Sequence, residues 1–160
     1  MRRILIVSDS HGRNDNVRLA IEKAGRIDSM IHLGDVGYDY LLVERMAGVP
    51  TYIVAGNNDY GGFLREMSII YMGTHRVLLV HGHRQGVYNG TDRIRYLALE
   101  NDCDIAMYGH THVPHLEEGG DVTIVNPGSI SLPRQIGHKK TFMIMEIDDN
   151  DRVTFKLDNI

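Results

Sequence analysis

The sequence predicts an α/β protein built from two β-sheets with helices on the outside. In the first half of the chain, strand-like apolar runs alternate with helix-like segments, which is typical of parallel strands joined by crossover helices. The second half instead contains paired apolar runs separated by short turns, which indicates hairpins and a second, mixed or antiparallel sheet. Because no linker, repeat or low-complexity tract interrupts the 160 residues, a single domain over residues 1–160 is expected.

The first strand-and-helix unit shows the pattern most clearly. The run Ile4–Val7 has the composition of a buried strand. A helix should follow its loop, with Asn14 and Asp15 as capping residues and Gly25 at its end. Its core-facing stripe has helical spacing and consists of Val17, Ala20, Ile21 and Ala24.

The remaining elements are expected in a regular order along the chain. In the first half they are a strand over 30–33, a helix over 41–46 and a strand over 52–54. In the second half they are a hairpin of 69–72 and 77–80, a helix capped by Thr91 or Asp92, a strand over 105–108, and hairpins around the turns 118–121 and 148–151.

Composition excludes several classes of protein. The chain is 42% hydrophobic and 24% charged, and no apolar run approaches the roughly 18 residues of a membrane span, so neither disorder nor membrane insertion is expected. Cys103 is the only cysteine, and the short apolar run near the start is no signal segment, so a cytoplasmic location is expected. With 17 basic and 21 acidic residues in a scattered pattern, no large nucleic-acid footprint is expected.

Polar groups follow five of the expected strands directly. Because strands of an α/β protein deliver such groups to the carboxyl edge of the sheet, these side chains are expected to meet. The candidate ligands are Asp9, His11, Asp35, Asn57, His81, His110 and His112. Each short motif alone could be a simple turn with satisfied polar groups, but five of them at strand ends indicate a site.

The chemistry of this set predicts a metal centre. Imidazole, carboxylate and amide ligands without thiolate suit Mn²⁺, Fe, Co²⁺, Ni²⁺ or Zn²⁺ better than Mg²⁺, and Mn²⁺ is the first expectation. Asp35 is a candidate bridge between two divalent ions. With two carboxylates and a bridging hydroxide, such a centre carries a charge of about +1, which favours a phosphate ester as substrate.

These motifs resemble those of the calcineurin-like metallophosphoesterase superfamily. Its DxH, GD, GN, lone strand-end His and GHxH groups occur here in order between Asp9 and His112, and Asn126–Ser129 is similar to its NPGS loop. The short length is similar to that of the small bacterial and archaeal phosphodiesterases of this family. The resemblance implies a four-layer α/β/β/α sandwich of two mixed sheets, and it implies homo-oligomers, which are frequent among such members.

The resemblance also implies roles for the ligands. One ion would take Asp9, His11, His112 and the bridging Asp35. The second ion would take the candidate catalytic residues Asp35, Asn57, His81 and His110. The choice of Asn57 over its neighbour Asn58 rests on the register of the family motif. The implied reaction is hydrolysis of a small phosphodiester by in-line attack of a metal-bridging hydroxide.

Three further residues are candidates for substrate binding. Asn58 stands where many family members have a histidine that can protonate the leaving oxygen, and an amide cannot replace that acid, so diesters with good leaving groups are expected to be preferred. His83 could orient a phosphate or support a ligand, or be an exposed loop histidine. Arg134 could contact phosphate or be a plain surface arginine.

Two alternatives remain open at this stage. The first is a catalytically weak scaffold of the same fold that binds a protein partner, as a retromer subunit of this family does. The second is a phosphomonoesterase or a nuclease, although the acidic charge balance argues against a long polyanionic substrate.

Overall fold

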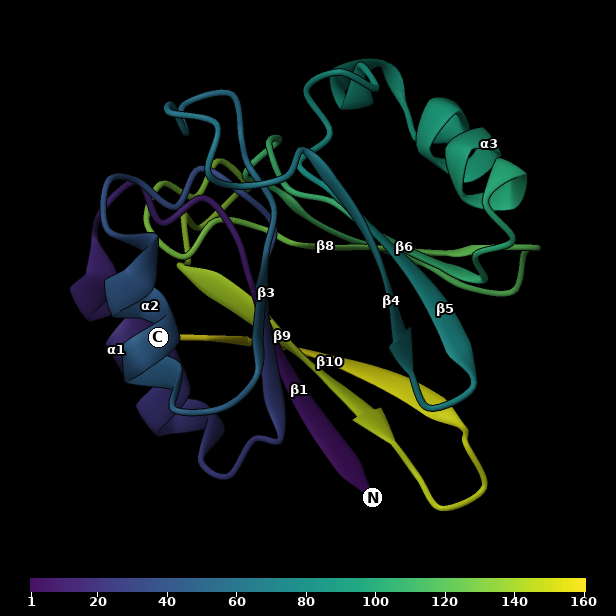
Figure 1. The fold of residues 1–160 in the computed structure, drawn as a ribbon, viewed down its shortest axis with the longest axis horizontal. Coiled ribbons are helices and arrows are strands. Elements are labelled where there is room, and N and C mark those ends of the chain that lie inside the picture. The colour runs from purple at the N-terminus through teal and green to yellow at the C-terminus, as the bar shows by residue number, and fades with distance from the viewer.

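Two five-stranded mixed sheets are stacked between helices in the computed structural model, which describes residues 1–160 (Figure 1). The first sheet has the order β10-β9-β1-β2-β3 and the second the order β4-β5-β6-β8-β7. The predicted fold class, with two mixed sheets and flanking helices, is therefore confirmed.

The first sheet combines early and late parts of the chain. Its strands are β1 (Arg2–Val7), β2 (Ser29–His32), β3 (Thr51–Ile53), β9 (Thr141–Ile147) and β10 (Val153–Asn159). The first three are parallel, as the alternating pattern predicts, whereas β9 pairs antiparallel with β1 on its other side. The predicted C-terminal hairpin is confirmed as β9–β10.

The second sheet is also mixed. Its strands are β4 (Met67–Met72), β5 (His75–Val80), β6 (Ile105–Met107), β7 (Pro114–Glu117) and β8 (Thr123–Pro127). The predicted hairpins are present as β4–β5 and β7–β8, while β5, β6 and β8 run parallel.

Helices cover the outer face of each sheet. α1 (Asn14–Ala24) and α2 (Tyr40–Ala47) lie on the first sheet, and α3 (Asp92–Glu100) lies on the second, after the short 3₁₀ turn η1 (Val87–Asn89) (Figure 1). The longest of them, α1, has 11 residues. None has the length and apolar character needed to span a bilayer.

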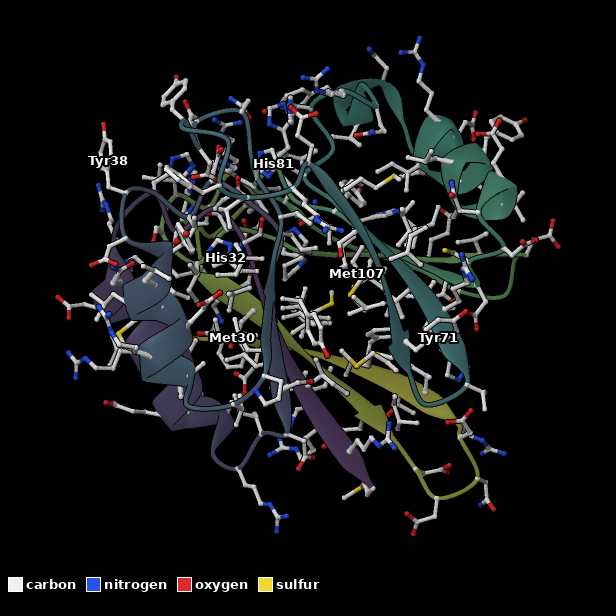
Figure 2. All side chains as sticks on the ribbon, in the orientation of Figure 1. Met30, His32, Tyr38, Tyr71, His81 and Met107 are labelled. Atoms are coloured by element: carbon white, nitrogen blue, oxygen red, sulfur yellow. The ribbon has the colours of Figure 1, made fainter.

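Three apolar clusters correspond to the three interfaces of this four-layer arrangement. A cluster of 15 buried residues fills the space between the sheets, 13 lie between the first sheet and its helices, and 10 lie beneath α3. Figure 2 shows Met107 in the central layer, whereas Tyr38 and Tyr71 project outward. The period of two along central strands such as β1 and β5 divides their side chains between two of these clusters, so the middle of each sheet is buried on both faces.

The predicted cap residues of α1 are wrong, whereas at α3 Thr91 stands at the predicted cap position without capping the helix through its side chain. Arg13, not Asn14 or Asp15, precedes α1, and no side chain caps that end. Asp15 lies in the first turn, where its negative charge interacts favourably with the helix dipole. Thr91 does precede α3, but its hydroxyl donates to Glu117 Oε2 at 3.2 Å and leaves the helix uncapped.

Candidate metal centre

The loops that follow β1, β2, β5 and β6 meet at one edge of the two sheets. Asp9 and His11 follow β1, and Asp35 follows β2, so they come from the first sheet. His81 follows β5 and the Gly109–His112 segment follows β6, so they come from the second. The structure thus brings six of the seven predicted ligands to the junction between the sheets.

One oxygen at this junction lacks a conventional partner. Asp9 is fully buried, and its Oδ1 makes no hydrogen bond. Three imidazole Nε2 atoms surround this oxygen, those of His112 at 3.1 Å, His81 at 3.8 Å and His11 at 3.9 Å. A buried carboxylate oxygen facing several ring nitrogens is an arrangement that a divalent cation would satisfy.

The potential ligand atoms form two overlapping groups. Asp9, His11 and His112 form the first, and Asp9, Asp35 and His81 form the second, with all atoms of a group within 4.8 Å of one another. Asp35 Oδ2 lies 3.6 Å from His11 Nε2 and 3.5 Å from His81 Nε2. Both carboxylates therefore lie within reach of both groups, and the residues present fit two neighbouring ions.

Hydrogen bonds fix the orientation of two of the histidine rings. His81 Nδ1 lies 2.6 Å from the Leu33 carbonyl oxygen, and His112 Nδ1 lies 2.7 Å from that of Leu132. A carbonyl can only accept, so each ring donates through Nδ1 and presents an unprotonated Nε2 to the centre when neutral. This outer support is typical of histidines that bind metals.

The backbone at the centre is strained. Eight non-glycine residues have a positive φ, and five of them are predicted ligands: Asp9 at 55°, His11 at 48°, Asp35 at 51°, His110 at 67° and His112 at 60°. Residues with side chains rarely adopt this left-handed conformation, which costs about 1–3 kcal/mol each and is concentrated at functional sites. The concentration of strained backbone at these five residues supports their assignment to the metal centre.

Two glycines are required by close approach at the same place. A Cβ at Gly109 would lie 2.0 Å from Ser8 Oγ and 2.8 Å from Asp9 Oδ2. A Cβ at Gly56 would lie 2.1 Å from Asp35 Oδ1. The glycines of the GH and GN motifs therefore make room for the carboxylates.

The carboxylates are held in their charged form. Burial alone would raise the pKa of Asp9, but the adjacent His112 and His81 rings and the Ser8 hydroxyl lower it below its ordinary value. For Asp35 the cost of burial is likewise outweighed by His81 and by hydrogen bonds from Asn58, so its pKa is well below the ordinary value. Both are therefore anionic at neutral pH, as ligands must be.

The rings differ in protonation according to their neighbours. Burial and the proximity of His81 lower the pKa of His110 to about 4, so its ring is neutral at pH 7. Burial would also lower the pKa of His81, but Asp35 and Asp9 outweigh it and raise the pKa. His110 Nδ1 lies 3.3 Å from His81 Nε2, close enough for the two rings to share a proton. A cation bound to these nitrogens would displace that proton.

The two neighbouring asparagines are placed differently from each other. Asn58 donates to Asp35 through its backbone N and its Nδ2, both at 2.8 Å. Asn57 is exposed and makes no side-chain hydrogen bond. The amide that contacts the Asp35 carboxylate is thus Asn58, while the assignment of Asn57 as a ligand stays a prediction.

The two other predicted substrate-binding residues lie at the rim of the centre. The His83 ring centroid is 5.5 Å from that of His81 and 6.0 Å from that of His110, and its buried Nδ1 makes no hydrogen bond. Arg134 is exposed and donates through Nη1 to Tyr88 Oη at 2.6 Å.

Tyr88 is a neighbour of the centre that the sequence does not reveal. Its hydroxyl donates to the His110 carbonyl oxygen at 3.1 Å, and the two rings meet edge to face at 4.9 Å. A single tyrosine in a loop has no spacing or motif, so only the packing of η1 against the β6 loop identifies it.

His32 occupies the core. It is fully buried on the same face of β2 as Met30 (Figure 2) and lies 2.9 Å from Ser10 Oγ through Nε2. Burial lowers its pKa to about 4, so the ring is neutral, and its contact with Ser10 supports the loop after β1.

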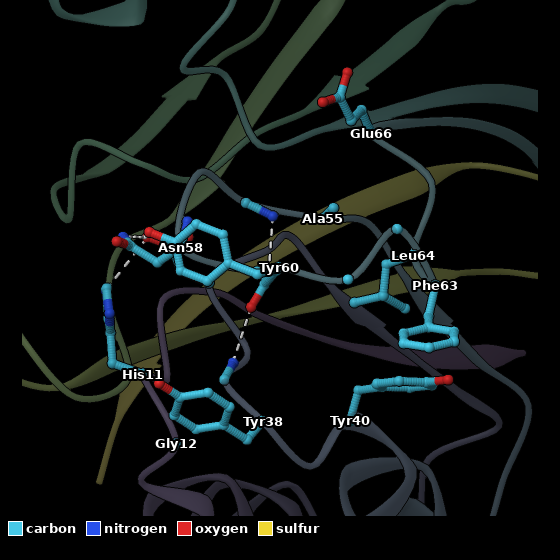
Figure 3. Close-up of a pocket in the computed structure, with 16 residues that line it drawn as sticks. His11, Gly12, Tyr38, Tyr40, Ala55, Asn58, Tyr60, Phe63, Leu64 and Glu66 are labelled. Atoms are coloured by element: carbon cyan, nitrogen blue, oxygen red, sulfur yellow. Dashed lines mark hydrogen bonds and ion pairs between the residues drawn. The ribbon is translucent and has the colours of Figure 1, made fainter.

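A pocket of about 890 Å³ opens beside the centre (Figure 3). His11, Asp35 and Asn58 line one end of it, and the rest is formed mainly by loops rich in glycine and aromatic residues. Figure 3 shows Tyr38 and Tyr60 on the His11 side, and Phe63 with Tyr40 and Leu64 on the other.

The fold and this centre define a phosphoesterase class that comparison with known proteins confirms. The family model for the calcineurin-like phosphoesterase superfamily domain matches residues 1–150. The chain belongs to this metal-dependent superfamily and has candidate metal-binding residues in place.

Two curated relatives are similar over most of their length. The probable metallophosphoesterase YsnB of Bacillus subtilis is 31% identical over 154 residues, which cover 96% of this chain and 88% of the relative. The phosphodiesterase YfcE of Escherichia coli K12 is 27% identical over 158 residues, covering 84% of this chain and 82% of the relative.

Two solved structures share the fold over nearly the whole chain. A predicted phosphoesterase from Streptococcus pneumoniae TIGR4 has a TM-score of 0.80 and 28% identity, covering 99% of this chain and 98% of that one. Wild-type Vps29 from Entamoeba histolytica, complexed with Zn²⁺, has a TM-score of 0.76 and 22% identity, covering 98% of both chains. The second likeness concerns the fold alone.

Proposed function

We propose that this protein is a metal-dependent phosphodiesterase that hydrolyses small phosphodiesters at a dinuclear centre. The buried Asp9 Oδ1, which faces three imidazole nitrogens and makes no hydrogen bond, is the observation that carries the proposal. The phosphodiesterase YfcE, a relative by sequence, supports the substrate class.

The ligands would divide between two ions. Asp9, His11 and His112 would hold one, His81, His110 and Asn57 the other, and Asp35 would contact both. When bound, Mn²⁺ or a similar divalent pair would supply a bridging hydroxide at neutral pH for in-line attack and would hold the attacking and leaving oxygens.

The side chains around the centre would position the phosphate. Arg134 and Tyr88 form one rim, and the guanidinium has hydrogen-bond donors that remain available to a phosphate oxygen. Asn58 already donates to Asp35 and carries no acidic proton, so the leaving oxygen would depart without an acid from this position. Diesters with good leaving groups would therefore react fastest.

The proposed substrate is small, and the proposed setting is the cytoplasm. A net charge of −4 without a basic stripe disfavours a long nucleic acid. Assembly into a homo-oligomer is part of the proposal, on the basis of family resemblance.

Initial rates on an aryl phosphodiester and the matching monoester test this function. They should be measured after chelation, after addition of Mn²⁺, and with Asp35→Asn alongside. Metal-dependent cleavage that favours the diester and is lost in the variant is expected. A preference for the monoester would replace the substrate class while keeping the centre.

A protein-binding scaffold is the second candidate. The likeness of the fold to Vps29 favours it, whereas the complete set of predicted ligands favours an enzyme. Absence of metal-dependent turnover on both esters would favour the scaffold.

A further inference from the structure

Three strongly exposed aromatic side chains line the pocket beside the metal centre. Tyr38, Tyr60 and Phe63 line it and have exposed fractions of 101%, 80% and 79%. Single exposed rings scattered over a surface are ordinary, whereas several rings gathered on one concave surface indicate a binding site.

This pocket is continuous with the centre. His11 and Asp35 belong to the centre and also line the pocket, and so does Asn58, which is hydrogen-bonded to Asp35. A phosphate held at the centre would therefore place one of its ester substituents in the pocket.

The charge of the pocket restricts what that substituent can be. Its lining contains the carboxylates of Asp35, Asp59 and Glu66 but no lysine or arginine. A substituent with further phosphates would find no cationic partner, whereas a neutral ring would be accepted.

The loops that carry the aromatic residues are held in place. Asp59 accepts hydrogen bonds from the backbone N of Gly37 at 3.0 Å and of Gly56 at 2.8 Å. It therefore joins the loop of Tyr38 to the loop of Tyr60. Gly61 has a φ of 105°, and a Cβ there would lie 3.0 Å from Phe63 Cε2, so the ring rests against this glycine.

We propose that this pocket is a subsite for a neutral aromatic substituent of the phosphodiester, such as an aryl group or a nucleobase, held by Tyr60, Phe63 and Tyr38. This inference rests on the proposed phosphodiesterase function and specifies its substrate. Stacking on these rings would select aromatic over alkyl esters at the same centre.

Phosphonates that are not hydrolysed allow the subsite to be tested apart from catalysis. Inhibition constants of phenylphosphonate, cyclohexylphosphonate and methylphosphonate should be measured against metal-dependent hydrolysis of bis(p-nitrophenyl) phosphate, at a pH where all three are dianions. Phenylphosphonate is expected to bind about 10-fold more tightly than methylphosphonate, with the cyclohexyl compound in between. If the protein does not hydrolyse the diester, ligand-observed NMR titrations of the metal-loaded protein give the same ratios.

Variants then identify the residues responsible. Tyr60→Ala and Phe63→Ala are expected to reduce the phenyl-to-methyl ratio to about 2-fold or less while leaving methylphosphonate binding within about 2-fold. Tyr96→Ala is the matched control, since Tyr96 is 64% exposed on α3 and does not line the pocket. Because damage to the metal centre would weaken all three phosphonates alike, the ratio reports the pocket.

Three results would overturn the inference. They are a ratio near one in the wild-type protein, an unchanged ratio in both pocket variants, and cyclohexylphosphonate binding as tightly as phenylphosphonate. Lack of diester hydrolysis with a ratio of about 10 by NMR would overturn the proposed function and support the aromatic subsite.

Discussion

The two sheets contribute different chemistry to the metal centre. The first sheet delivers both carboxylates, Asp9 and Asp35, through loops with left-handed backbone. The second delivers three of the four predicted histidine ligands, His81, His110 and His112. Neither sheet alone presents a complete ligand group, because every group in the structure contains residues from both. The centre is thus a property of the junction, and its integrity should depend on how the sheets are held together.

Removal of a carboxylate from the first sheet should have the largest effect. Asp35 lies within reach of imidazoles from both sheets, so Asp35→Asn should weaken both ions and lower metal-dependent turnover by more than about 100-fold. Metal content by mass spectrometry and initial rates on an aryl diester measure this. Asp121→Asn, in an exposed turn, is the control. Full activity with two bound ions would refute a bridging role.

Removal of an imidazole from the second sheet should have a smaller effect. His110 contacts His81 but belongs to neither three-residue group that contains Asp9, so His110→Ala should weaken one ion and lower turnover by about 10- to 100-fold. Calorimetric titration with Mn²⁺ should show one site weakened and the other retained. Equal weakening of both sites would mean that His110 does not serve one ion alone.

Crowding at the junction should cost stability. Gly109→Ala would place a Cβ against Ser8 and Asp9, and the required shift should lower the free energy of unfolding by about 1–3 kcal/mol. Urea denaturation without metal measures this. In Gly120→Ala the new Cβ would lie 3.1 Å from Arg95 Nη1, at the end of a flexible side chain, and 4.0 Å from the Val122 carbonyl oxygen, so little change is expected. Equal stability of the two variants would show that the loops from the two sheets can move apart at Gly109 without loss of stability.

A proton donor placed on the first sheet should alter substrate preference. Asn58→His is expected to raise turnover of an alkyl diester relative to an aryl diester by about 10-fold, since a positioned acid helps a poor leaving group most. Asn58→Ala removes the amide without adding an acid and should show no such gain. An unchanged ratio in Asn58→His would contradict the account of leaving-group departure.

The smallest effect is expected far from the centre, where His75 at the start of β5 joins the sheets. Burial tends to lower the pKa of His75, but the Asp151 carbonyl and the Asp104 carboxylate raise it above its ordinary value. The protonated ring therefore stabilises the fold fully below the unfolded pKa of about 6.5, and this contribution is lost as the pH rises through the folded pKa.

His75→Gln isolates this contribution. The stability advantage of the wild-type protein over the variant should shrink between about pH 6 and pH 9 by less than about 1 kcal/mol, because the partner carboxylates are partly exposed. Urea denaturation at both pH values measures it. An advantage that grows with pH would contradict the assigned direction.

The sequence was most informative where local patterns determine structure. Apolar runs such as Ile4–Val7 predict strands because burial on both faces requires continuous hydrophobicity. The polar groups after them predict the centre because parallel strands bring their carboxyl ends to one edge.

Features that depend on contacts between distant segments were not predicted. Nothing in Thr141–Ile147 shows that it pairs with β1, because an apolar strand can join either sheet. The hydroxyl of Thr91 donates to Glu117, a residue distant in sequence that a local capping rule does not consider. Tyr88 and the aromatic pocket likewise depend on how separate loops pack, and the choice between two adjacent asparagines depends on a loop conformation that a motif register does not specify.

The position of β1 has a consequence for the order of folding. β1 pairs with β2 on one side, early in the chain, and with β9 on the other, where Leu5 lies opposite Ile144. During synthesis from the N-terminus, every predicted ligand emerges before β9 does, while one edge of β1 still lacks its partner. An open edge on an apolar strand is prone to pair with other chains. The strand that supports the Asp9 loop therefore has both of its neighbours in place only when nearly the whole chain has left the ribosome.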